Sequence, residues 1–176
     1  ARVFVPLCGK SLDLGWLLSR GYAVAGSELS EQAVTQLFAE LGMEVHISEV
    51  GKFRLFRGER IDIFVGDIFD LTREILGPVD AVYDRAALVA LPEAMRSRYT
   101  AHLKAITGMA PQLVIGYEYD QTVLAGPPFS VTPDELHRHY SDDYVLTLLA
   151  RVEIPGGLKG KCPATEHIWR LDKRPG

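Results

Sequence analysis

The sequence predicts one α/β domain in which helices alternate with the strands of a mostly parallel sheet. Apolar runs of strand length alternate along the chain with segments of helical periodicity, which is the pattern of this class. The composition is ordinary for a globular protein, with 47% apolar and 24% charged residues. A length of 176 residues suits a single domain with a real core. No internal repeat, low-complexity tract or domain linker is visible.

The first thirty residues predict a strand, a turn, a helix and a second strand. Residues 3–7 are an apolar run that ends at the small residues Cys8 and Gly9. Residues 12–20 have helical spacing, with Ser11 before them as an N-cap. A second apolar run, residues 22–26, ends close to Glu28. Ligands of an open parallel sheet lie outside the carboxyl ends of its strands, so we expect the turn and this acid to be neighbours.

The remaining elements follow in order. A helix is predicted over residues 31–41, between an N-cap at Ser30 and a stop at Gly42. A second is predicted over residues 92–107, and a short one opens at Thr132. Further strands are expected at residues 45–47, 53–56, 61–65, 79–83, 113–117, 144–152 and 167–171. On the 92–107 helix the pattern assigns Met95, Tyr99, Leu103 and Ile106 to one apolar face, and Arg96, Arg98 and Lys104 to water.

Five predicted strands end in residues that could face one cleft. These residues are Leu7, Glu28, Asp67, the pair Asp84 and Arg85, and the run Glu118, Tyr119 and Asp120. Polar residues after strands are also ordinary turn formers, so each of them has a plain structural alternative. Their repetition at successive strand ends is what favours a binding site.

Two nucleotide motifs are excluded by the glycines near the first turn. Gly9 is followed by Lys and Ser, as at the end of a phosphate-binding P-loop, but Phe4 stands where that loop requires a glycine. The dinucleotide fingerprint requires three spaced glycines, and only Gly9 and the later Gly15 are present. A nicotinamide oxidoreductase is therefore disfavoured. A ligand with adenosine and no pyrophosphate remains.

Three polar side chains suit parts of such a ligand. The carboxylate of Glu28 can accept hydrogen bonds from two ribose hydroxyls, although Glu28 could simply precede the capped helix. Asp67 can accept from an exocyclic adenine amine, or be a turn residue after Gly66. The guanidinium of Arg85 can face a carboxylate or a developing anion, or pair with Asp84 or Asp67.

Other features restrict cofactors, partners and compartment. Cys8 has no histidine associated with it by any motif, so we expect a core thiol. The histidines are scattered, and no metal site is expected. Two cysteines indicate no disulfide framework and favour a reduced, cytoplasmic protein. The net charge of −4 disfavours nucleic acid and anionic membranes, and no apolar run is long enough to span a bilayer. Nothing demands more than a monomer.

Four segments, in this order, resemble the thiopurine S-methyltransferase family. They are VPLCGKS at residues 5–11, GSELS at 26–30, YDRAAL at 83–88 and GPPFSV at 126–131. The resemblance implies a class I methyltransferase (Rossmann-like) fold, with helices on both faces of a seven-stranded, mostly parallel sheet whose last strand is antiparallel. It implies S-adenosylmethionine as methyl donor, no metal, and an aromatic or heterocyclic thiol as acceptor.

The resemblance also assigns residues. Residues implied on the donor are Leu7, Gly9, Glu28, Leu29, Asp67, Ile68 and Arg85. Residues implied on the acceptor are Arg85, Pro128 and Phe129, the last two on a rigid loop that could wall an aromatic pocket. Family members begin with a further segment that helps to cover the donor, so residues 1–176 are expected to be the domain without it. Residues 155–165 differ from the family, and Lys159 and Lys161 are candidates for an acceptor-side cation.

The implied reaction is an in-line methyl transfer to a thiolate. Alignment of the reactants does most of the work, with Arg85 favouring the thiolate. Asp84 is the poorer helper, because an anion repels a thiolate. Two alternatives stay open at this point: methylation of selenium or tellurium compounds, and a module that binds S-adenosylmethionine without catalysis.

Overall fold

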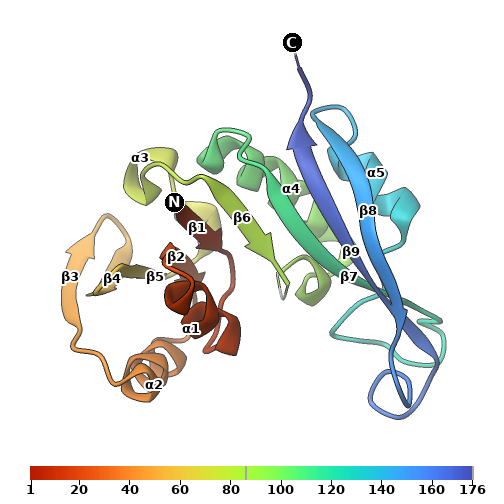
Figure 1. Ribbon diagram of the computed structural model, residues 1–176, viewed down its shortest axis with the longest axis horizontal. Coiled ribbons are helices and arrows are strands. Elements are labelled where there is room, and N and C mark those ends of the chain that lie inside the picture. The colour runs from red at the N-terminus through yellow and green to blue at the C-terminus, as the bar shows by residue number, and fades with distance from the viewer. Residues whose placement is uncertain (86, 176) are drawn as a thin grey trace. The chain divides into compact units, whose positions relative to one another are not determined.

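The computed structural model describes residues 1–85 and 87–175, and the chain divides into two compact units (Figure 1). Unit 1 comprises Ala1–Tyr83 and Ile106–Gly108, and unit 2 comprises Asp84–Ala105 and Met109–Gly176. The described residues form nine strands rather than the seven expected, within the α/β class that the sequence predicts.

Unit 1 is an α/β unit whose central strands are parallel. Its strands are β1 (Arg2–Val5), β2 (Ala23–Glu28), β3 (His46–Val50), β4 (Phe53–Gly58), β5 (Ile61–Val65) and β6 (Ala81–Asp84), in the spatial order β3-β4-β5-β2-β1-β6. Strand β2 pairs in parallel with β1 and β5, and β1 pairs in parallel with β6. Strands β3 and β4 are antiparallel and extend the edge beyond β5, which raises the strand count above seven.

The helices of unit 1 begin and end largely where the capping residues predict. They are α1 (Leu12–Ser19), α2 (Glu31–Leu41), the 3₁₀ turn η1 (Ile68–Asp70) and α3 (Arg73–Leu76). Ser11 and Ser30 both cap through their side chains, and Gly42 ends α2 in a left-handed conformation. Helix α3 is not among the elements expected from the sequence, although Thr72 caps it through a side-chain hydrogen bond. The first strand ends at Val5 and not at Leu7, because the chain already turns at Leu7 with φ of 48°.

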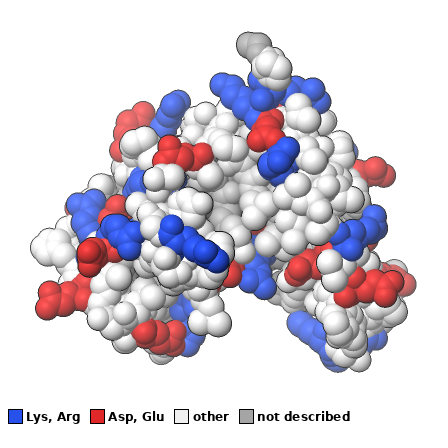
Figure 2. Space-filling model, in the orientation of Figure 1, with Lys and Arg blue, Asp and Glu red and all other residues white. Residues whose placement is uncertain are grey.

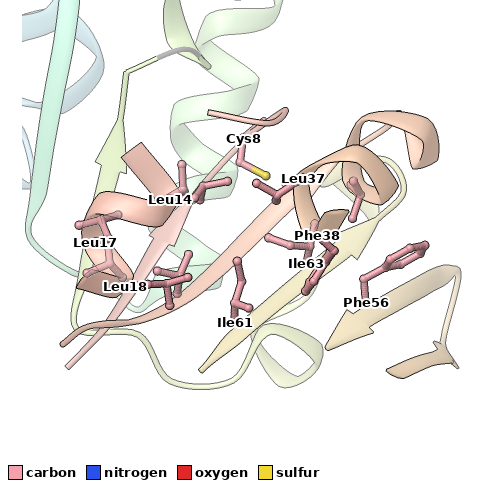
Figure 3. Close-up of a cluster of buried hydrophobic side chains, with 13 residues drawn as sticks. Cys8, Leu14, Leu17, Leu18, Leu37, Phe38, Phe56, Ile61 and Ile63 are labelled. Carbon is pink, nitrogen blue, oxygen red and sulfur yellow. The ribbon is translucent and has the colours of Figure 1, made fainter. Parts of the chain in front are cut away.

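The core of unit 1 lies between the parallel strands and helices α1 and α2 (Figure 3). Leu14 and Leu17 of α1 and Leu37 and Phe38 of α2 pack over Ile63 of β5. Residues that alternate with this set, such as Phe4 and Phe64, point to the other face and are buried as well. Burial on both faces is typical of parallel strands and explains their nearly continuous apolar sequences.

Unit 2 is antiparallel. Its elements are the 3₁₀ turn η2 (Leu88–Ala90), α4 (Glu93–Thr107), β7 (Gln112–Tyr119), α5 (Pro133–Tyr140), β8 (Tyr144–Glu153) and β9 (Ala164–Lys173). The last strand, β9, pairs antiparallel with both β7 and β8, as the resemblance implies for a last strand. The ring of His137 on α5 meets that of Trp169 on β9 edge to face at 5.6 Å, so α5 packs on this sheet.

Helix α4 departs from its predicted faces at two positions. Tyr99, Leu103 and Ile106 are buried as expected, but Met95 is 37% exposed. Arg96, expected in water, is only 3% exposed. Its guanidinium forms a bidentate pair with Glu135 of α5, at 2.6 and 3.1 Å. A helical wheel cannot anticipate this, because the partner lies 39 residues further along the chain.

Candidate functional site

The turn after β1 is fastened to the end of β2 by three hydrogen bonds. The N–H of Leu7 donates to the hydroxyl of Ser27 at 3.1 Å, and the N–H of Cys8 donates to the carbonyl of Ser27 at 2.8 Å. The N–H of Gly9 donates to Oε1 of Glu28 at 3.1 Å. Gly9 has a φ of +55°, a conformation that glycine adopts without strain. The two segments that the sequence predicts as neighbours are therefore joined.

The carboxylate of Glu28 bridges this turn and the start of α2. Its Oε1 accepts from Gly9, and its Oε2 accepts from the N–H of Ser30 at 2.7 Å. Each carboxylate oxygen can accept a second hydrogen bond, so two acceptor positions remain for a pair of hydroxyls. The backbone donors that could hold a phosphate already face a carboxylate, and a further anion would be repelled. The site suits a ribose and disfavours a phosphate.

The end of β5 lies beside Glu28. The N–H of Gly66 donates to the carbonyl of Glu28 at 2.9 Å. Asp67 is exposed, and its Oδ1 accepts from the N–H of Phe69 at 2.9 Å, which caps the turn η1. Ile68 is 4% exposed. Asp67 thus acts as a turn residue, which was the structural alternative to its binding role. Its carboxylate is exposed and can still accept hydrogen bonds from a ligand.

Six predicted donor residues gather in unit 1, after the carboxyl ends of three neighbouring parallel strands. They are Leu7, Gly9, Glu28, Leu29, Asp67 and Ile68. Leu29 is 67% exposed, so an apolar side chain lies at the surface next to these polar groups. The arrangement offers acceptors for hydroxyl and amine groups next to exposed apolar surface, as a nucleoside requires.

Cys8 lies in the core beneath this turn and is 4% exposed. Burial, and secondarily the nearby negative charge of Glu28, raises the pKa of the Cys8 thiol to about 12. Because the thiolate is the reactive form, this thiol is inert at neutral pH. The expectation of a core thiol agrees with this environment.

Arg85 belongs to unit 2 and follows β6. Its side chain is exposed, and its charge acts on the phenol of Tyr117 on β7. Burial raises the pKa of Tyr117, the carboxylate of Glu166 adds to the rise, and the guanidinium of Arg85 opposes it. Tyr117 and Glu166 are register partners on β7 and β9. Neither Tyr117 nor Glu166 was a candidate from the sequence. Strand alternation together with the pairing of β7 and β9 is the signal that places the two side chains on one face.

Asp84 is fully buried, as is the ring of Tyr99, which donates its hydroxyl proton to Oδ2 of Asp84 at 2.7 Å. Oδ1 of Asp84 accepts from the N–H groups of Ala87 and Leu88 at 3.2 and 3.1 Å. Burial raises the pKa of Asp84, and these three hydrogen bonds oppose the rise. Asp84 therefore faces the protein interior and organises the chain that follows Arg85.

The loop with the predicted acceptor residues is held from several sides. The N–H of Phe129 donates to the carbonyl of Val89 at 2.6 Å, and the guanidinium of Arg96 lies 5.8 Å from the ring of Phe129. The carbonyl of Pro128, a half-buried residue, accepts from the hydroxyl of Tyr119 at 2.5 Å. These contacts leave the ring of Phe129 half-buried on a fixed loop.

Residues predicted at other strand ends and in the tail have local structural partners. Glu118 forms an ion pair with Arg151, and Asp120 caps its own turn by accepting from Thr122. The ammonium of Lys159 donates to the carbonyl of Pro127 at 3.0 Å. Lys161 lines a cavity of about 440 Å³, together with Glu118 and the loop between β8 and β9. Lys159 thus tethers the loop that contains Pro127, and Lys161 is the one of the two lysines that lines this cavity.

Within residues 1–85 and 87–175, no group of three or more His, Cys, Asp or Glu side chains could hold a metal ion. In the same part of the chain, no helix is both long and apolar enough to cross a bilayer.

Sequence relatives cover nearly the whole chain. Thiopurine S-methyltransferase of Xanthobacter autotrophicus is 57% identical over 173 residues, which cover 98% of this chain and 81% of the relative. The enzyme of the same name from Teredinibacter turnerae is 52% identical over 171 residues, covering 97% and 80%.

Solved structures show the same fold at low sequence identity. A SAM-dependent methyltransferase from Methanosarcina mazei has a TM-score of 0.70 at 14% identity, covering 97% of this chain and 92% of that chain. The 1,6-didemethyltoxoflavin-N1-methyltransferase of Burkholderia thailandensis, solved with bound S-adenosylhomocysteine, has a TM-score of 0.62 at 17% identity, covering 97% and 71%. The fold is therefore that of the class I methyltransferases.

The family model described as thiopurine S-methyltransferase matches residues 1–169. This match shows that the chain belongs to the thiopurine S-methyltransferase family.

Proposed function

We propose that this protein transfers the methyl group of S-adenosylmethionine to the sulfur of aromatic or heterocyclic thiols. The observation that carries the donor assignment is the Glu28 carboxylate, held between the N–H groups of Gly9 and Ser30 at the end of β2. This arrangement accepts a ribose and rejects a phosphate. The family match carries the acceptor class.

All proposed donor contacts except that of Arg85 come from unit 1. Glu28 binds the two ribose hydroxyls, and Leu7 and Gly9 contact the donor through the turn that Glu28 holds. Leu29, Asp67 and Ile68 flank the adenine, where the exposed Asp67 carboxylate can accept from an exocyclic amine. The donor supplies a methyl group already activated on a sulfonium, so no metal or base is required for its departure.

The proposed acceptor residues come from unit 2. The guanidinium of Arg85 touches the acceptor sulfur and stabilises its thiolate, as it opposes the raised pKa of the neighbouring Tyr117 phenol. Pro128 and the ring of Phe129 pack against the acceptor ring. Arg85 also contacts the donor, as the family resemblance implies. Alignment of thiolate and methyl group can lower the barrier by about 7–11 kcal/mol.

The setting that we propose is that of a single-domain monomer in the cytoplasm. Cys8 and Cys162 are free and buried, a state that a reducing compartment preserves. The partner is a small molecule rather than nucleic acid or membrane, because acidic and basic side chains are interspersed on the face shown in Figure 2 and the net charge is −4.

The decisive experiment incubates the full-length protein with methyl-labelled donor and a panel of aromatic thiols, to which selenium and tellurium nucleophiles are added. We expect methylated thiols. Tight donor binding without any methylated product would instead indicate a binding module. A methylated product with selenium or tellurium compounds alone would replace thiols by those compounds as the acceptor class. Absence of donor binding would refute the proposal.

Two variants separate donor from acceptor roles. We expect Glu28→Ala to weaken donor affinity by 100-fold or more, since two lost charge-assisted hydrogen bonds are worth about 3–6 kcal/mol, as measured by calorimetry. Arg85→Ala should lower kcat with a smaller effect on donor affinity. Donor binding by Glu28→Ala that equals the parent's would show that the ribose assignment is wrong.

A further inference from the structure

One buried carboxylate next to the proposed catalytic arginine has no part in the reaction above. We propose that Asp84, together with Tyr99, is a positioning residue that sets the geometry of the acceptor side by holding the backbone of Ala87 and Leu88, which stand between Arg85 and Val89 in the sequence. The inference rests on the proposed function, because the acceptor side is defined by Arg85 and Phe129.

Both oxygens of the Asp84 carboxylate accept hydrogen bonds from groups inside the protein. Oδ1 holds the N–H groups of Ala87 and Leu88, and Oδ2 holds the hydroxyl of Tyr99. Neither Asp84 nor Tyr99 has any solvent exposure. A carboxylate in this place cannot reach a thiol proton, which excludes a role as general base. It orients the backbone two and three residues beyond Arg85.

The same segment also holds the second acceptor residue. The carbonyl of Val89 accepts from the N–H of Phe129 at 2.6 Å, and the carbonyl of Leu91 accepts from Arg96 at 2.9 Å. The Arg96 guanidinium then lies 5.8 Å from the Phe129 ring. A shift of the segment at its Asp84 end would therefore move both the arginine and the ring that contact the acceptor.

An anion so fully buried is costly, and an asparagine would have nearly the same shape. In the variant Asp84→Asn, the amide oxygen could still accept from Ala87 and Leu88, and the NH₂ group could donate to the Tyr99 oxygen. Asp84→Asn thus keeps the positioning and removes the charge. Asp84→Ala removes both, and Tyr99→Phe removes a single hydrogen bond and keeps the ring.

The kinetic test compares Asp84→Asn, Asp84→Ala and Tyr99→Phe in the full-length protein, with a methyl-labelled donor and an aromatic thiol. We expect Asp84→Ala to lose roughly 10- to 100-fold in kcat, the scale of a misplacement of about 1 Å. Asp84→Asn should stay within a few-fold of the parent. Calorimetric donor affinity should change much less than kcat in all three, since the donor residues other than Arg85 lie in unit 1. An Asp84→Asn loss equal to that of Asp84→Ala would overturn the proposal.

A double-mutant cycle shows whether Asp84 acts through Arg85. In an Arg85→Ala background we expect Tyr99→Phe to cost less turnover than it costs in the parent, because one of the two groups that it positions is gone. Independent, additive losses would mean that the pair is merely structural. The cycle uses Tyr99→Phe because it removes one hydrogen bond and preserves the packed ring.

Amide hydrogen exchange tests the positioning without any activity. Tyr99→Phe and Asp84→Ala should accelerate exchange at Ala87, Leu88 and Phe129, and Asp84→Asn should not. Unchanged exchange at these amides in Asp84→Ala or Tyr99→Phe would overturn the proposal even in an active enzyme. An inactive parent with the expected exchange pattern would instead refute the proposed function and leave the hydrogen-bonded network standing.

Discussion

Units 1 and 2 are built on different physical principles. Unit 1 has a core of apolar side chains between parallel strands and helices, and its site residues lie on turns at strand ends. Unit 2 instead buries several charged or hydrogen-bonding side chains, each with a partner distant in sequence. They are Asp84, Arg96, Gln112, Glu135 and His167. The proposed donor residues thus lie on turns at the ends of parallel strands, whereas the proposed acceptor residues lie beside a network of buried polar side chains.

This difference sets how each unit should respond to mutation. An apolar core loses stability in proportion to the volume and surface removed. A buried polar network loses much more when one partner is deleted, because the other is left without its hydrogen bonds in a medium of low polarity. Four variants test the contrast, from the largest expected effect to the smallest.

The largest effect should come from Arg96→Leu in unit 2. The change leaves Glu135 without its bidentate partner, and both side chains are less than a tenth exposed. We expect a loss of about 3–5 kcal/mol in the free energy of unfolding, measured by chemical denaturation. The matched control is Arg54→Leu in unit 1, whose pair with Glu31 is roughly half exposed and should be worth about 0–1 kcal/mol. Equal losses in the two variants would erase the contrast between the units.

Gly26→Ala probes the close packing behind the donor turn in unit 1. A Cβ at this position would lie 2.7 Å from Cδ1 of Ile63 and 2.9 Å from Sγ of Cys8. We expect a loss of about 1–3 kcal/mol in unfolding free energy, and weaker donor binding because Cys8 belongs to the turn that holds Gly9. Gly15→Ala is the control: its Cβ would meet Leu41 at an ordinary 3.5 Å, and stability should be kept or raised. Unchanged donor affinity in Gly26→Ala would show that the packing around Gly26 does not affect the donor site.

His167 should make unit 2 sensitive to acid. Its Nε2 lies 3.1 Å from the carbonyl of Val131, and its Nδ1 accepts from the indole N–H of Trp169 at 2.8 Å, so the neutral ring is fully satisfied. Burial lowers the pKa of His167 below its ordinary 6.5. The unfolded chain therefore binds a proton at His167 more readily than the folded protein does. The stability contributed by the neutral ring is present above pH 6.5 and is lost as the pH falls from there towards the folded pKa.

The check for His167 is unfolding free energy measured across pH 7.5 to 5. His167→Gln cannot take up a proton in this range, so its curve should be flatter than the parent's below about pH 6.5. Parallel curves for parent and variant would assign the acid sensitivity to other groups.

The smallest effect on stability should come from Leu29→Ala at the donor site. The side chain is 67% exposed, so the unfolding free energy should change by no more than about 0.5 kcal/mol. If Leu29 contacts the donor as proposed, calorimetry should still show weaker donor binding. Unchanged affinity would remove Leu29 from the site.

The fold and the donor side were largely predictable because their signals are local. The caps Ser11 and Ser30 and the stop Gly42 act on residues within a few positions of themselves, and all three behave as expected. The glycine pattern excluded a phosphate ligand before the structure showed Glu28 facing the backbone donors. The donor assignments of these residues stay predictions until a ligand is measured.

The acceptor side was less predictable because its contacts span long sequence distances. Arg96 looked like a solvent-facing helix residue, yet it pairs with a glutamate 39 residues away. Tyr117 and Glu166 became neighbours through strand register, which no single segment displays. Lys159 proved to bind the carbonyl of Pro127, a contact across 32 residues.

The sequence by itself determined the fold class, the family resemblance and the carboxylate at the end of β2, since periodicity, caps and motifs are properties of short segments. Tertiary structure alone decided how the charged groups of unit 2 are satisfied. It placed Asp84 in the interior with three donors and left Arg85 exposed beside it. The physical reason is burial: whether a charge meets water or a partner depends on which distant segments pack around it, and adjacent residues on one strand end can meet opposite environments.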